Sequence, residues 1–527
     1  MTHPWGALIG IDLGTTYSCV AHLSRDGVPA TIPNREGDLI TPSVILFDES
    51  GQILVGREAK RTECVMPDRT AVCVKRDMGE PRYSRTVAGQ SFRPEVLSAL
   101  ILKRLRADAV ARLGRVDAAV ITVPAYFDDT RRKATQDAGR LVGLTVLDIL
   151  NEPTAAALAY TYEEHMRKSG GIDALAESLD RRPTTSLVYD LGGGTFDVSV
   201  VRMQGDRFEV LATDGDVRLG GRDWDQTLVD HAAEAFVREH GDDPRLDPES
   251  LAQLFQAAEQ AKHSLSVRMT TRMLVVHAGR RLPLEVTRDL FDELTLPLLT
   301  RTRMTSELVL EGAGLEWADV DRVLLVGGMT RCPQVRRMLR ETTGLEPDAS
   351  LAADEVVAHG AAIHGGLLLA KGATLAPQHP LGPWVRMTRV DVNSHSLGIS
   401  VRTPEGAYAN SILIPRNTPL PVSRKRVYKT AVANQRQVRV RVLEGEAPDA
   451  TACVQIGEFV LGHLPDDLPE RSPIEVECRY GTDGRISVSG FDPDSGSIAE
   501  TEIHRPGFIA DDELAAEAKR MESIEVG

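Results

Sequence analysis

Residues 9–20 read I-G-I-D-L-G-T-T-Y-S-C-V, and residues 188–200 read V-Y-D-L-G-G-G-T-F-D-V-S-V. In each stretch an alternating apolar run stops at Asp-Leu-Gly, passes through small and hydroxyl residues, and resumes, which predicts a strand, a tight turn and a strand. Glycine lets successive N–H groups of such a turn point into one anion-binding concavity. Asp12 and Asp190 lie at the mouths of the two hairpins, where carboxylates can hold a hydrated Mg²⁺ beside phosphates. The repetition predicts a duplicated domain that closes on one nucleotide.

The composition is that of an ordinary soluble protein of several domains. The chain has 527 residues, of which 42% are hydrophobic and 26% charged, so two to four domains are expected. No apolar run approaches the ~18 residues of a membrane span, and the N-terminus does not resemble a signal peptide. Six scattered cysteines without a C-x-x-C pair favour reduced thiols in a cytoplasm. The net charge of −15 argues against nucleic-acid binding.

The chain divides into an α/β part and a β part. Residues 1–375 alternate short apolar strands with amphipathic helices, and the polar stretch Glu163–Thr185 is interpreted as a connector between the two halves. Helical patterning ends in a Gly- and Pro-punctuated stretch, so we place a domain linker at 376–390. Residues 391–510 alternate with period two between turn signals, which predicts a β-sandwich. Residues 511–527 open with acidic residues typical of a helix start.

Two further segments fit the base-binding side of a phosphate-transfer cleft. The apolar run Val323–Val326 opens into Gly327-Gly328, where a planar base can approach the backbone and Arg331 can stack on it. Glu259, Lys262 and Ser266 share one face of a helix, as expected for contacts to ribose and a base edge. Taken alone, the glycine pair fits an ordinary turn and Glu259–Lys262 a surface ion pair.

Two charged residues fit the phosphate side of the same cleft. Lys75 follows the strand-like A-V-C-V and offers a cation for phosphates, and Glu152 precedes a proline at a helix entrance. Taken alone, Lys75 fits a solvated lysine. A purely structural role is least convincing for Asp12 and Asp190, because the same Asp-Leu-Gly hairpin occurs twice in the chain.

Together these motifs resemble the heat-shock protein 70 (DnaK-type) chaperones. The resemblance rests on D-L-G-T-T-Y-S, A-V-I-T-V-P-A-Y-F, N-E-P-T-A-A-A-L-A-Y, Y-D-L-G-G-G-T-F-D and V-G-G-M-T-R-C-P, and continues into D-V-N-S-H-S-L-G at 391–398. It covers roughly residues 6 to 515. It implies an α/β actin-like two-lobed ATPase domain followed by an all-β peptide-binding sandwich, which binds ATP or ADP with Mg²⁺ and K⁺ and hydrolyses ATP.

The resemblance also implies roles for individual residues. The implied catalytic residues are Lys75, Glu152, Asp190, Asp197 and Thr195, and Asp12 and Asp190 would hold Mg²⁺ through water. The implied nucleotide-binding residues are Asp12, Gly14, Thr15, Thr16, Tyr17, Gly192, Gly193, Gly194, Thr195, Gly220, Gly221, Glu259, Lys262, Ser266, Gly327, Gly328, Arg331 and Asp354. The implied allosteric relay is Pro124, Arg132 and Asp391. The implied peptide-binding residues are Ile399, Arg402, Tyr428, Ala431, Val438 and Val440, although alternation alone would equally make several of them inward-facing sandwich residues.

Several features depart from the family pattern. The chain stops just after the family's helical lid would begin, which predicts a short form with only a helical stub of the lid at 511–527. Met387-Thr388-Arg389-Val390 stands where the family has an apolar linker run, which puts the coupling of the two domains in doubt. Asp148 stands where the family usually has an arginine that meets J-domain co-chaperones. We therefore expect a dedicated co-chaperone or none. The outer segments Gly79–Phe92 and Val267–Leu282 are shorter than is typical of the family, which puts the usual contacts of a nucleotide exchange factor in question.

The sandwich carries a cluster of basic residues. Between residues 386 and 445 there are eleven Lys or Arg against three acids, including Arg402, Arg424, Lys425, Arg426, Lys429, Arg436, Arg439 and Arg441. Two interpretations stay open: a solvated strand face, or a basic rim that favours apolar segments flanked by Asp or Glu.

The sequence leaves three functions to compare. The first is a cytoplasmic chaperone that binds extended unfolded segments, with ATP hydrolysis controlling its affinity. The second is a nucleotide-switched recruitment module for one dedicated partner, with little general chaperone activity. The third, an actin-fold filament former or small-molecule kinase, is disfavoured because neither needs the sandwich at residues 391–506. No membrane or nucleic-acid partner is expected.

Overall fold

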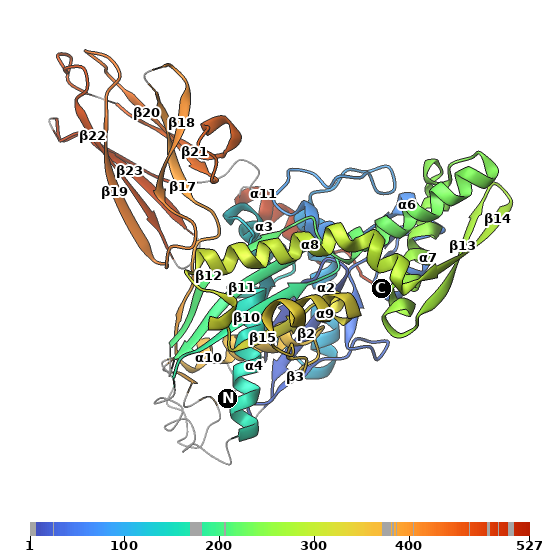
Figure 1. Ribbon diagram of the computed structural model, residues 1–527. Helices are drawn as coiled ribbons and strands as arrows, with labels where there is room; N and C mark the ends of the chain where they lie inside the picture. The colour runs from blue at the N-terminus through green and yellow to red at the C-terminus, as the bar shows by residue number, and fades with distance from the viewer. Residues whose placement is uncertain are drawn as a thin grey trace.

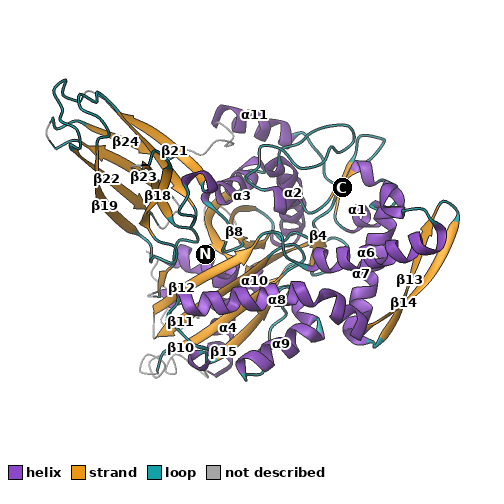
Figure 2. Ribbon diagram, turned by 45° about the horizontal axis from the view of Figure 1, so that its top comes forward, coloured by secondary structure: helices purple, strands orange, loops and turns teal. Residues whose placement is uncertain are grey.

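The computed structural model describes residues 7–24, 26–168, 182–204, 207–371, 381, 384–385, 387–403, 405–462, 464–481, 485–493, 495–503 and 511–527. Figure 1 shows a large α/β body with a β-sandwich projecting from one side of it. Figure 2 shows the same arrangement by secondary structure, with helices concentrated in the body and strands predominating in the projecting part. The predicted fold class, an α/β two-lobed domain followed by an all-β sandwich, is confirmed.

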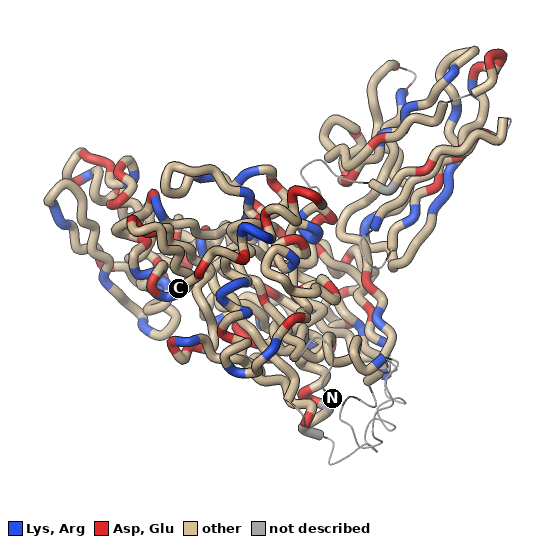
Figure 3. Tube along the Cα trace, turned by 180° about the vertical axis from the view of Figure 1, so that it is seen from behind, with Lys and Arg blue, Asp and Glu red and all other residues tan. Residues whose placement is uncertain are grey.

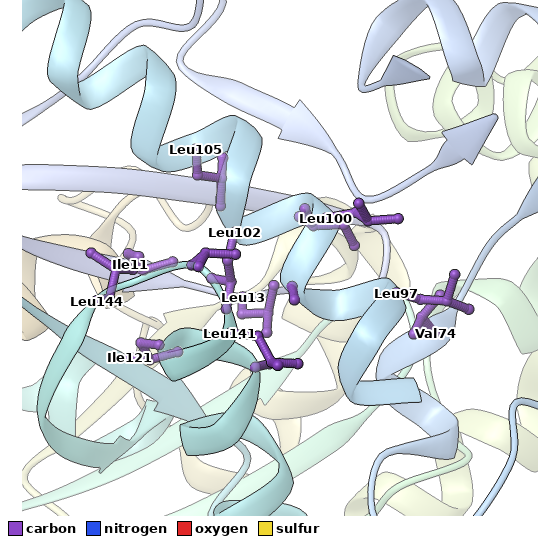
Figure 4. Close-up of a cluster of buried hydrophobic side chains, with 14 of the residues drawn as sticks. Ile11, Leu13, Val74, Leu97, Leu100, Leu102, Leu105, Ile121, Leu141 and Leu144 are labelled. Atoms are coloured by element: carbon purple, nitrogen blue, oxygen red, sulfur yellow. The ribbon is translucent and has the colours of Figure 1, made fainter. Parts of the chain in front are cut away.

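The first half of the body, lobe I, is built on a sheet of six strands in the order β3-β2-β1-β8-β9, with β4 paired to β2. Its elements are β1 (Ala7–Asp12), β2 (Tyr17–Leu23), β3 (Pro29–Thr31), β4 (Ile40–Pro42), β5 (Ile45–Phe47), β6 (Ile53–Val55), α1 (Arg57–Thr62), η1 (Pro67–Arg69), β7 (Thr70–Ala71), η2 (Val74–Asp77), α2 (Pro94–Leu113), β8 (Val116–Val123), α3 (Asp129–Leu141), β9 (Thr145–Asn151) and α4 (Glu152–Lys168). Figure 4 shows how Ile11 and Leu13 meet leucines of α2 and Leu141 of α3 in the buried core of this lobe.

The second half, lobe II, is built on a five-stranded sheet in the order β15-β10-β11-β12-β16. Its elements are β10 (Thr184–Leu191), β11 (Phe196–Gln204), β12 (Arg207–Asp216), α6 (Gly221–His240), η3 (Pro244–Leu246), α7 (Pro248–Val267), β13 (Thr270–His277), β14 (Arg280–Thr287), α8 (Arg288–Gly312), η4 (Trp317–Asp319), β15 (Arg322–Val326), η5 (Gly328–Arg331), α9 (Pro333–Thr343) and β16 (Thr388–Val390). Helix α10 (Val356–Ala370) follows α9 in the chain but packs on β1, β2 and β8 of lobe I. In both lobes the first strand of the quoted hairpin is antiparallel to the next strand and parallel to a later one, so the repeated sequence corresponds to a repeated topology.

Two helices, α4 and α10, lie between the sheets of the two lobes. Their apolar residues share one buried cluster with Val120 of β8 and Val188 of β10. The helices touch closely at Gly360, where an added Cβ would lie 1.8 Å from the carbonyl oxygen of Ala155. Helix α4 also corrects the connector expected from Glu163, because it continues to Lys168; residues 169–181 of that stretch lie outside the described residues.

The projecting part is a sandwich of two four-stranded sheets, β18-β17-β20-β21 and β19-β22-β23-β24. Its elements are β17 (Leu397–Arg402), β18 (Tyr408–Ile414), β19 (Val422–Lys429), β20 (Val438–Glu444), η7 (Ala450–Ala452), β21 (Val454–Leu461), β22 (Pro473–Tyr480), β23 (Ile486–Phe491) and β24 (Ile498–Glu502). Because side chains of a strand point alternately to its two faces, Ile474, Val476 and Cys478 of β22 all face the core of the sandwich.

The helix predicted after residue 510 forms as α11 (Asp511–Glu522), and it packs against α3 of lobe I. Met521 is buried in the lobe I core, and Lys103 Nζ donates to the carbonyl oxygens of Met521 and Ile524 at 2.5 and 2.6 Å. Val526 pairs with Ile53 of β6. Figures 1 and 2 both show α11 beside α3, so the described part of this segment belongs to the body and not to the sandwich.

Two observations concern the environment of the protein. All six cysteines are free thiols. Within the described part of the chain, none of the helices has the length and apolar content needed to cross a membrane.

Candidate functional site

The turns of the two quoted hairpins face each other across the gap between the lobes. A Cβ added at Gly193 would lie 2.0 Å from Thr16 Oγ1, and one added at Gly194 would lie 2.2 Å from Thr15 Cγ2. Only glycine allows two loops to meet this closely, which explains why the second hairpin needs a glycine run opposite the hydroxyls of the first. The nest of N–H groups expected from the sequence is therefore shared between the lobes.

Behind these turns lies a cluster of buried charge. Lys75 Nζ lies 2.5 Å from Glu152 Oε1, and both side chains are almost fully buried. Burial, reinforced by Glu152, raises the pKa of Asp12 to about 7, and the same two causes raise the pKa of Asp197 to about 8. Burial and the neighbouring carboxylates raise the pKa of Asp190 well above its ordinary value. Burial alone would lower the pKa of Lys75, but Glu152 and Asp12 raise it.

The cluster thus sets four carboxyl groups against one ammonium group. Packing carboxylates together out of water is unfavourable unless cations join them, so the geometry fits a site that binds Mg²⁺ and takes up the phosphates of a nucleotide beside it. In the described residues, no group of three or more His, Cys, Asp or Glu side chains is close enough to hold a metal directly. That Asp12 and Asp190 hold the ion through water stays a prediction from the sequence.

The base side of the cleft is formed by α7 and the turn after β15. Lys262 Nζ lies 2.8 Å from Asp225 and donates to the carbonyl oxygen of Gly221 at 3.0 Å. Glu259 forms a 2.9 Å ion pair with Lys60 of lobe I, so this pair spans the mouth of the cleft. Arg331, more than half exposed, pairs with Asp354. The Glu259–Lys262 pair considered from the sequence is thus replaced by separate partners for each residue.

The cleft encloses about 660 Å³, enough for a nucleotide. Sixteen of the predicted nucleotide-binding residues line it: Asp12, Gly14, Thr15, Thr16, Tyr17, Gly192, Gly193, Thr195, Gly221, Glu259, Lys262, Ser266, Gly327, Gly328, Arg331 and Asp354. Lys75, Glu152 and Asp190 line it as well. Gly194 and Gly220 stand behind the wall, where an added Cβ at Gly220 would lie 2.6 Å from Gly194 N. The A-V-C-V context of Lys75 predicted a strand before it. The structure has only the two-residue strand β7 there, and Lys75 itself lies in the short helix η2.

The sequence reasoning did not identify three charged residues in or beside the cleft. Lys60 pairs with Glu259, Asp225 pairs with Lys262, and Arg76 donates from its Nε to the carbonyl oxygen of Gly194 at 3.0 Å. Arg76 also pairs with Asp223 at 2.6 Å, so it is a second contact between the lobes. No local pattern marks these residues, because each acquires its role from a partner on a distant element.

The cleft is connected to the sandwich through the loop after β8. Asp197 Oδ1 accepts a hydrogen bond from Tyr126 N at 3.1 Å, and the Tyr126 ring packs edge-on against His395, with 4.3 Å between centroids. Arg132 donates to Asn151 Oδ1 at 2.5 Å, beside Glu152. Pro124, the first residue of the same loop, lies two residues before Tyr126. Pro124 therefore precedes the loop residues that join the charged cluster to the sandwich, whereas Arg132 donates to Asn151 and Ile149 within lobe I.

A second set of contacts joins lobe II to the sandwich. Arg416 forms a 3.0 Å ion pair with Asp214 of β12. Asn417 Oδ1 accepts from Thr213 N at 3.0 Å. The sandwich therefore contacts the body at residues 125–126 and at residues 213–214, so both lobes touch it.

The linker pairs with the body although it lacks the apolar run that the family has there. Despite its polar sequence, residues Thr388–Val390 form β16, which adds in parallel to the edge of the lobe II sheet opposite Arg207–Glu209 of β12. Arg389 is held by Asp148, and by Asp391 at 2.9 Å. The predicted relay residue Asp391 thus binds within the linker. Of the predicted linker, residues 376–380, 382–383 and 386 lie outside the described residues.

The predicted peptide-binding residues fall into two groups. Ile399 and Val440 are buried in the sandwich core, with Val438 and Tyr428 packed partly buried against it. Arg402 and Ala431 are exposed. Tyr428 donates to Ser411 Oγ at 3.2 Å, which holds its ring between the two sheets. The alternative of inward-facing sandwich residues therefore describes Ile399 and Val440, and the remaining four lie nearer the surface.

Comparison with known proteins agrees with this geometry. The family model described as Hsp70 protein matches residues 8–90 and 80–526. Proteins named chaperone protein DnaK from Thermotoga petrophila, Thermotoga neapolitana and Thermotoga maritima are each 42% identical to the chain over 530 aligned positions. Each alignment covers 98% of this chain and 84% of the relative.

Proposed function

Because the chain belongs to the Hsp70 family, whose members are ATPases, we propose that it is an ATP-dependent chaperone in which the cleft controls how tightly the sandwich holds extended unfolded polypeptide. The observation that carries this function is the continuous contact from the charged cluster to the sandwich. Asp197 in the cluster binds Tyr126, and Tyr126 packs on His395. The family membership does not favour the alternative of a recruitment module for one partner.

We assign the chemistry of the cleft as follows. The facing glycine-rich turns bind phosphate oxygens through N–H groups, and Lys75 stabilises the negative charge that develops on the transferred phosphoryl group. Glu152 holds Lys75 in place and, with Asp190 and Asp197, orients the attacking water. A hydrated Mg²⁺, with K⁺ beside it, would neutralise the phosphates. Lys262 and Glu259 on α7 and Arg331 contact the adenosine part.

We propose that peptide binds near the loops that follow β17 and β19. Tyr428 and Val438 would supply the apolar pocket there, and exposed backbone would hold the extended segment. Fewer basic residues are available to attract acidic peptide flanks than the sequence suggested. Lys425, Arg436, Arg439 and Arg441 already have acidic partners within the sandwich. Figure 3 shows both basic (blue) and acidic (red) segments on the strands of the sandwich.

Three basic residues of β19 remain for that preference. Arg424, Arg426 and Lys429 are exposed and, among the described residues, have no acidic side chain within ion-pair distance. We expect peptides with Asp or Glu flanks to bind more tightly than the same peptides with Lys or Arg flanks, by about 2- to 5-fold. Arg424→Gln combined with Arg426→Gln should remove the difference on a peptide array, whereas Arg441→Gln should not. Equal binding of both flank types by the unaltered chain would contradict the preference.

The Asp148–Arg389 pair bears on which co-chaperones can bind the ATPase body. Asp148 pairs with the linker arginine, so we propose that a generic J-domain stimulates this chain weakly and that a dedicated co-chaperone takes its place. A nucleotide exchange factor would act at the lobe edges. We place the protein in the cytoplasm, which its free thiols fit. Strong stimulation of ATP hydrolysis by a generic J-domain would contradict the first of these points.

The central experiment measures dissociation of a fluorescent unfolded peptide with Mg-ATP and with Mg-ADP. We expect ATP to accelerate release by at least about tenfold, as a coupling free energy of ordinary size requires. Asp12→Asn, which alters the cleft alone, should abolish the acceleration without abolishing peptide binding. Peptide that binds but leaves at the same rate with either nucleotide would contradict the proposed coupling, and failure to bind peptide would contradict the chaperone function itself.

A further inference from the structure

The linker strand is anchored by apolar residues on both sides of a charged centre. Trp384 is 5% exposed and packs near Tyr162, with 5.4 Å between ring centroids, and Val392 is 4% exposed. Between them β16 pairs with β12, and Arg389 stands opposite Phe208 in the register. A guanidinium group at this place is mostly withdrawn from water, so it needs partners that compensate for the lost hydration.

Arg389 finds these partners on β9, on α10 and on the linker itself. Its two Nη atoms donate to Asp148 Oδ2 on β9, each at 3.3 Å, and its Nε lies 2.9 Å from Asp391 Oδ2. His364 Nε2, on α10, lies 3.1 Å from Arg389 Nη1 and 2.7 Å from Asp148 Oδ2. Burial opposes the charged form of Asp148, but His364 and Arg389 outweigh it and lower the pKa to about 2, so this carboxylate is ionised at neutral pH.

The location of the pair gives it a specific consequence. Strand β16 belongs to the sheet of lobe II, whereas Asp148 belongs to the sheet of lobe I. The Arg389–Asp148 pair therefore forms only when the two lobes hold the relative position seen here while the linker lies in its groove. The same relative position sets the width of the nucleotide cleft, because Arg76 and Lys60 link the lobes there.

We propose that Asp148 and Arg389 form an ionic latch that fastens the linker strand to both lobes, so that this chain senses lobe closure through a charge pair. The proposal rests on the proposed nucleotide-dependent chaperone cycle. When the latch opens, both charges return to water, which makes opening reversible and salt-dependent in a way that an apolar linker is not. The polar residues that made coupling doubtful from the sequence are thereby the residues that provide it.

The test is hydrogen–deuterium exchange of the backbone amides of residues 388–390 in the full chain, with Mg-ATP and with Mg-ADP. We expect ATP to protect these amides, and Asp148→Asn or Arg389→Gln to reduce that protection by at least about fivefold. Because the two groups act on each other, the double variant should lose no more protection than either single variant. Arg389→Lys should restore part of it, and raised salt should weaken protection in the unaltered chain only.

Asp117→Asn is the matched control. Asp117 also accepts from two arginines, Arg106 and Arg115, but among the described residues it has no ion pair with the linker, so its substitution should leave protection unchanged. Additive losses in the double variant, or full protection in both single variants, would overturn the latch. Since exchange at the linker is read without peptide, these outcomes are distinct from a failure of ATP to release peptide, which would instead overturn the proposed function.

Discussion

The nucleotide cleft and the linker junction both bury charged side chains between the lobes, but they balance them differently. In the cleft, Asp12, Glu152, Asp190 and Asp197 share one lysine, and burial raises the pKa of Asp12 to about 7. At the junction, Asp148 and Arg389 satisfy each other, and the pKa of Asp148 falls to about 2. Both sites are polar, but the cleft sets four carboxyl groups against one ammonium group, whereas at the junction Arg389 faces Asp148 and Asp391.

This difference distinguishes a ligand site from an internal fastening. A buried cluster with excess negative charge gains stability when a cation or a positively compensated ligand enters. A cluster in which each charge has an opposite charge in contact gains less from a ligand and instead stabilises one arrangement of the elements that carry its charges. The electrostatic balance of each site therefore predicts what will perturb it.

Removing the lysine of the buried charged cluster should have the largest effect. Lys75→Ala takes away the ammonium group that pairs with Glu152, so we expect ATP hydrolysis to fall by about 10²–10³-fold. Single-turnover hydrolysis of radiolabelled ATP measures this loss. The exposed Lys429→Ala should hydrolyse ATP at the normal rate, and linker protection by ATP should persist in Lys75→Ala. A Lys75→Ala protein that retains normal hydrolysis would show that the cleft does not use this charge.

Proton release should be the next largest effect and should occur only in the cleft. The pKa values of Asp12 and Asp197, about 7 and about 8, are raised, so their protonated forms are populated at neutral pH without a cation. Bound Mg²⁺ favours the ionised forms, so the affinity for Mg-ADP should rise with pH between 6 and 8, by up to about tenfold per unit for each proton released. Calorimetry in buffers of different ionisation enthalpy measures the protons.

Asp148 offers the contrast for that experiment. Its pKa of about 2 lies far below the range tested, so linker protection by saturating nucleotide should not change between pH 6 and 8. Mg-ADP binding without proton release would mean that the cleft carboxylates are already ionised, and the electrostatic distinction between the two sites would then disappear.

The smallest effect should come from the pair that closes the mouth of the cleft. Lys60 and Glu259 are partly exposed, with 24% and 15% of their side chains accessible, so their pairing contributes modestly. We expect Lys60→Gln to speed ADP dissociation by about 2- to 5-fold, measured by stopped-flow with a fluorescent ADP. Arg61→Gln, on the same helix with its partner Glu58 exposed, should have no effect. An unchanged ADP off-rate in Lys60→Gln would show that this pair does not restrain the open cleft.

The sequence was most informative where function depends on local backbone geometry. The two Asp-Leu-Gly hairpins, the Gly327-Gly328 turn and the period-two strands of the sandwich are each encoded within about ten consecutive residues, because turns and alternating burial are short-range properties. The fold class and most of the cleft wall could therefore be predicted.

Pairs of charges on distant elements escaped that reasoning. Lys60 and Glu259 are about 200 positions apart, and Asp148 and Arg389 about 240, so neither pairing leaves a local trace. The sequence indicated that Asp148 replaces an arginine that contacts J-domains and that Arg389 interrupts the apolar run of the linker. The structure shows that these two residues form an ion pair with each other.

The sequence by itself determined the repeated hairpins, the two-part organisation and the residue types that a nucleotide requires, because those depend on neighbours along the chain. Only the tertiary structure decided which charges meet, which lobe carries α11, and that the polar linker still adds to the lobe II sheet. The physical reason is that the energy of a buried charge depends on every group packed around it, and those groups come together only when the chain has folded.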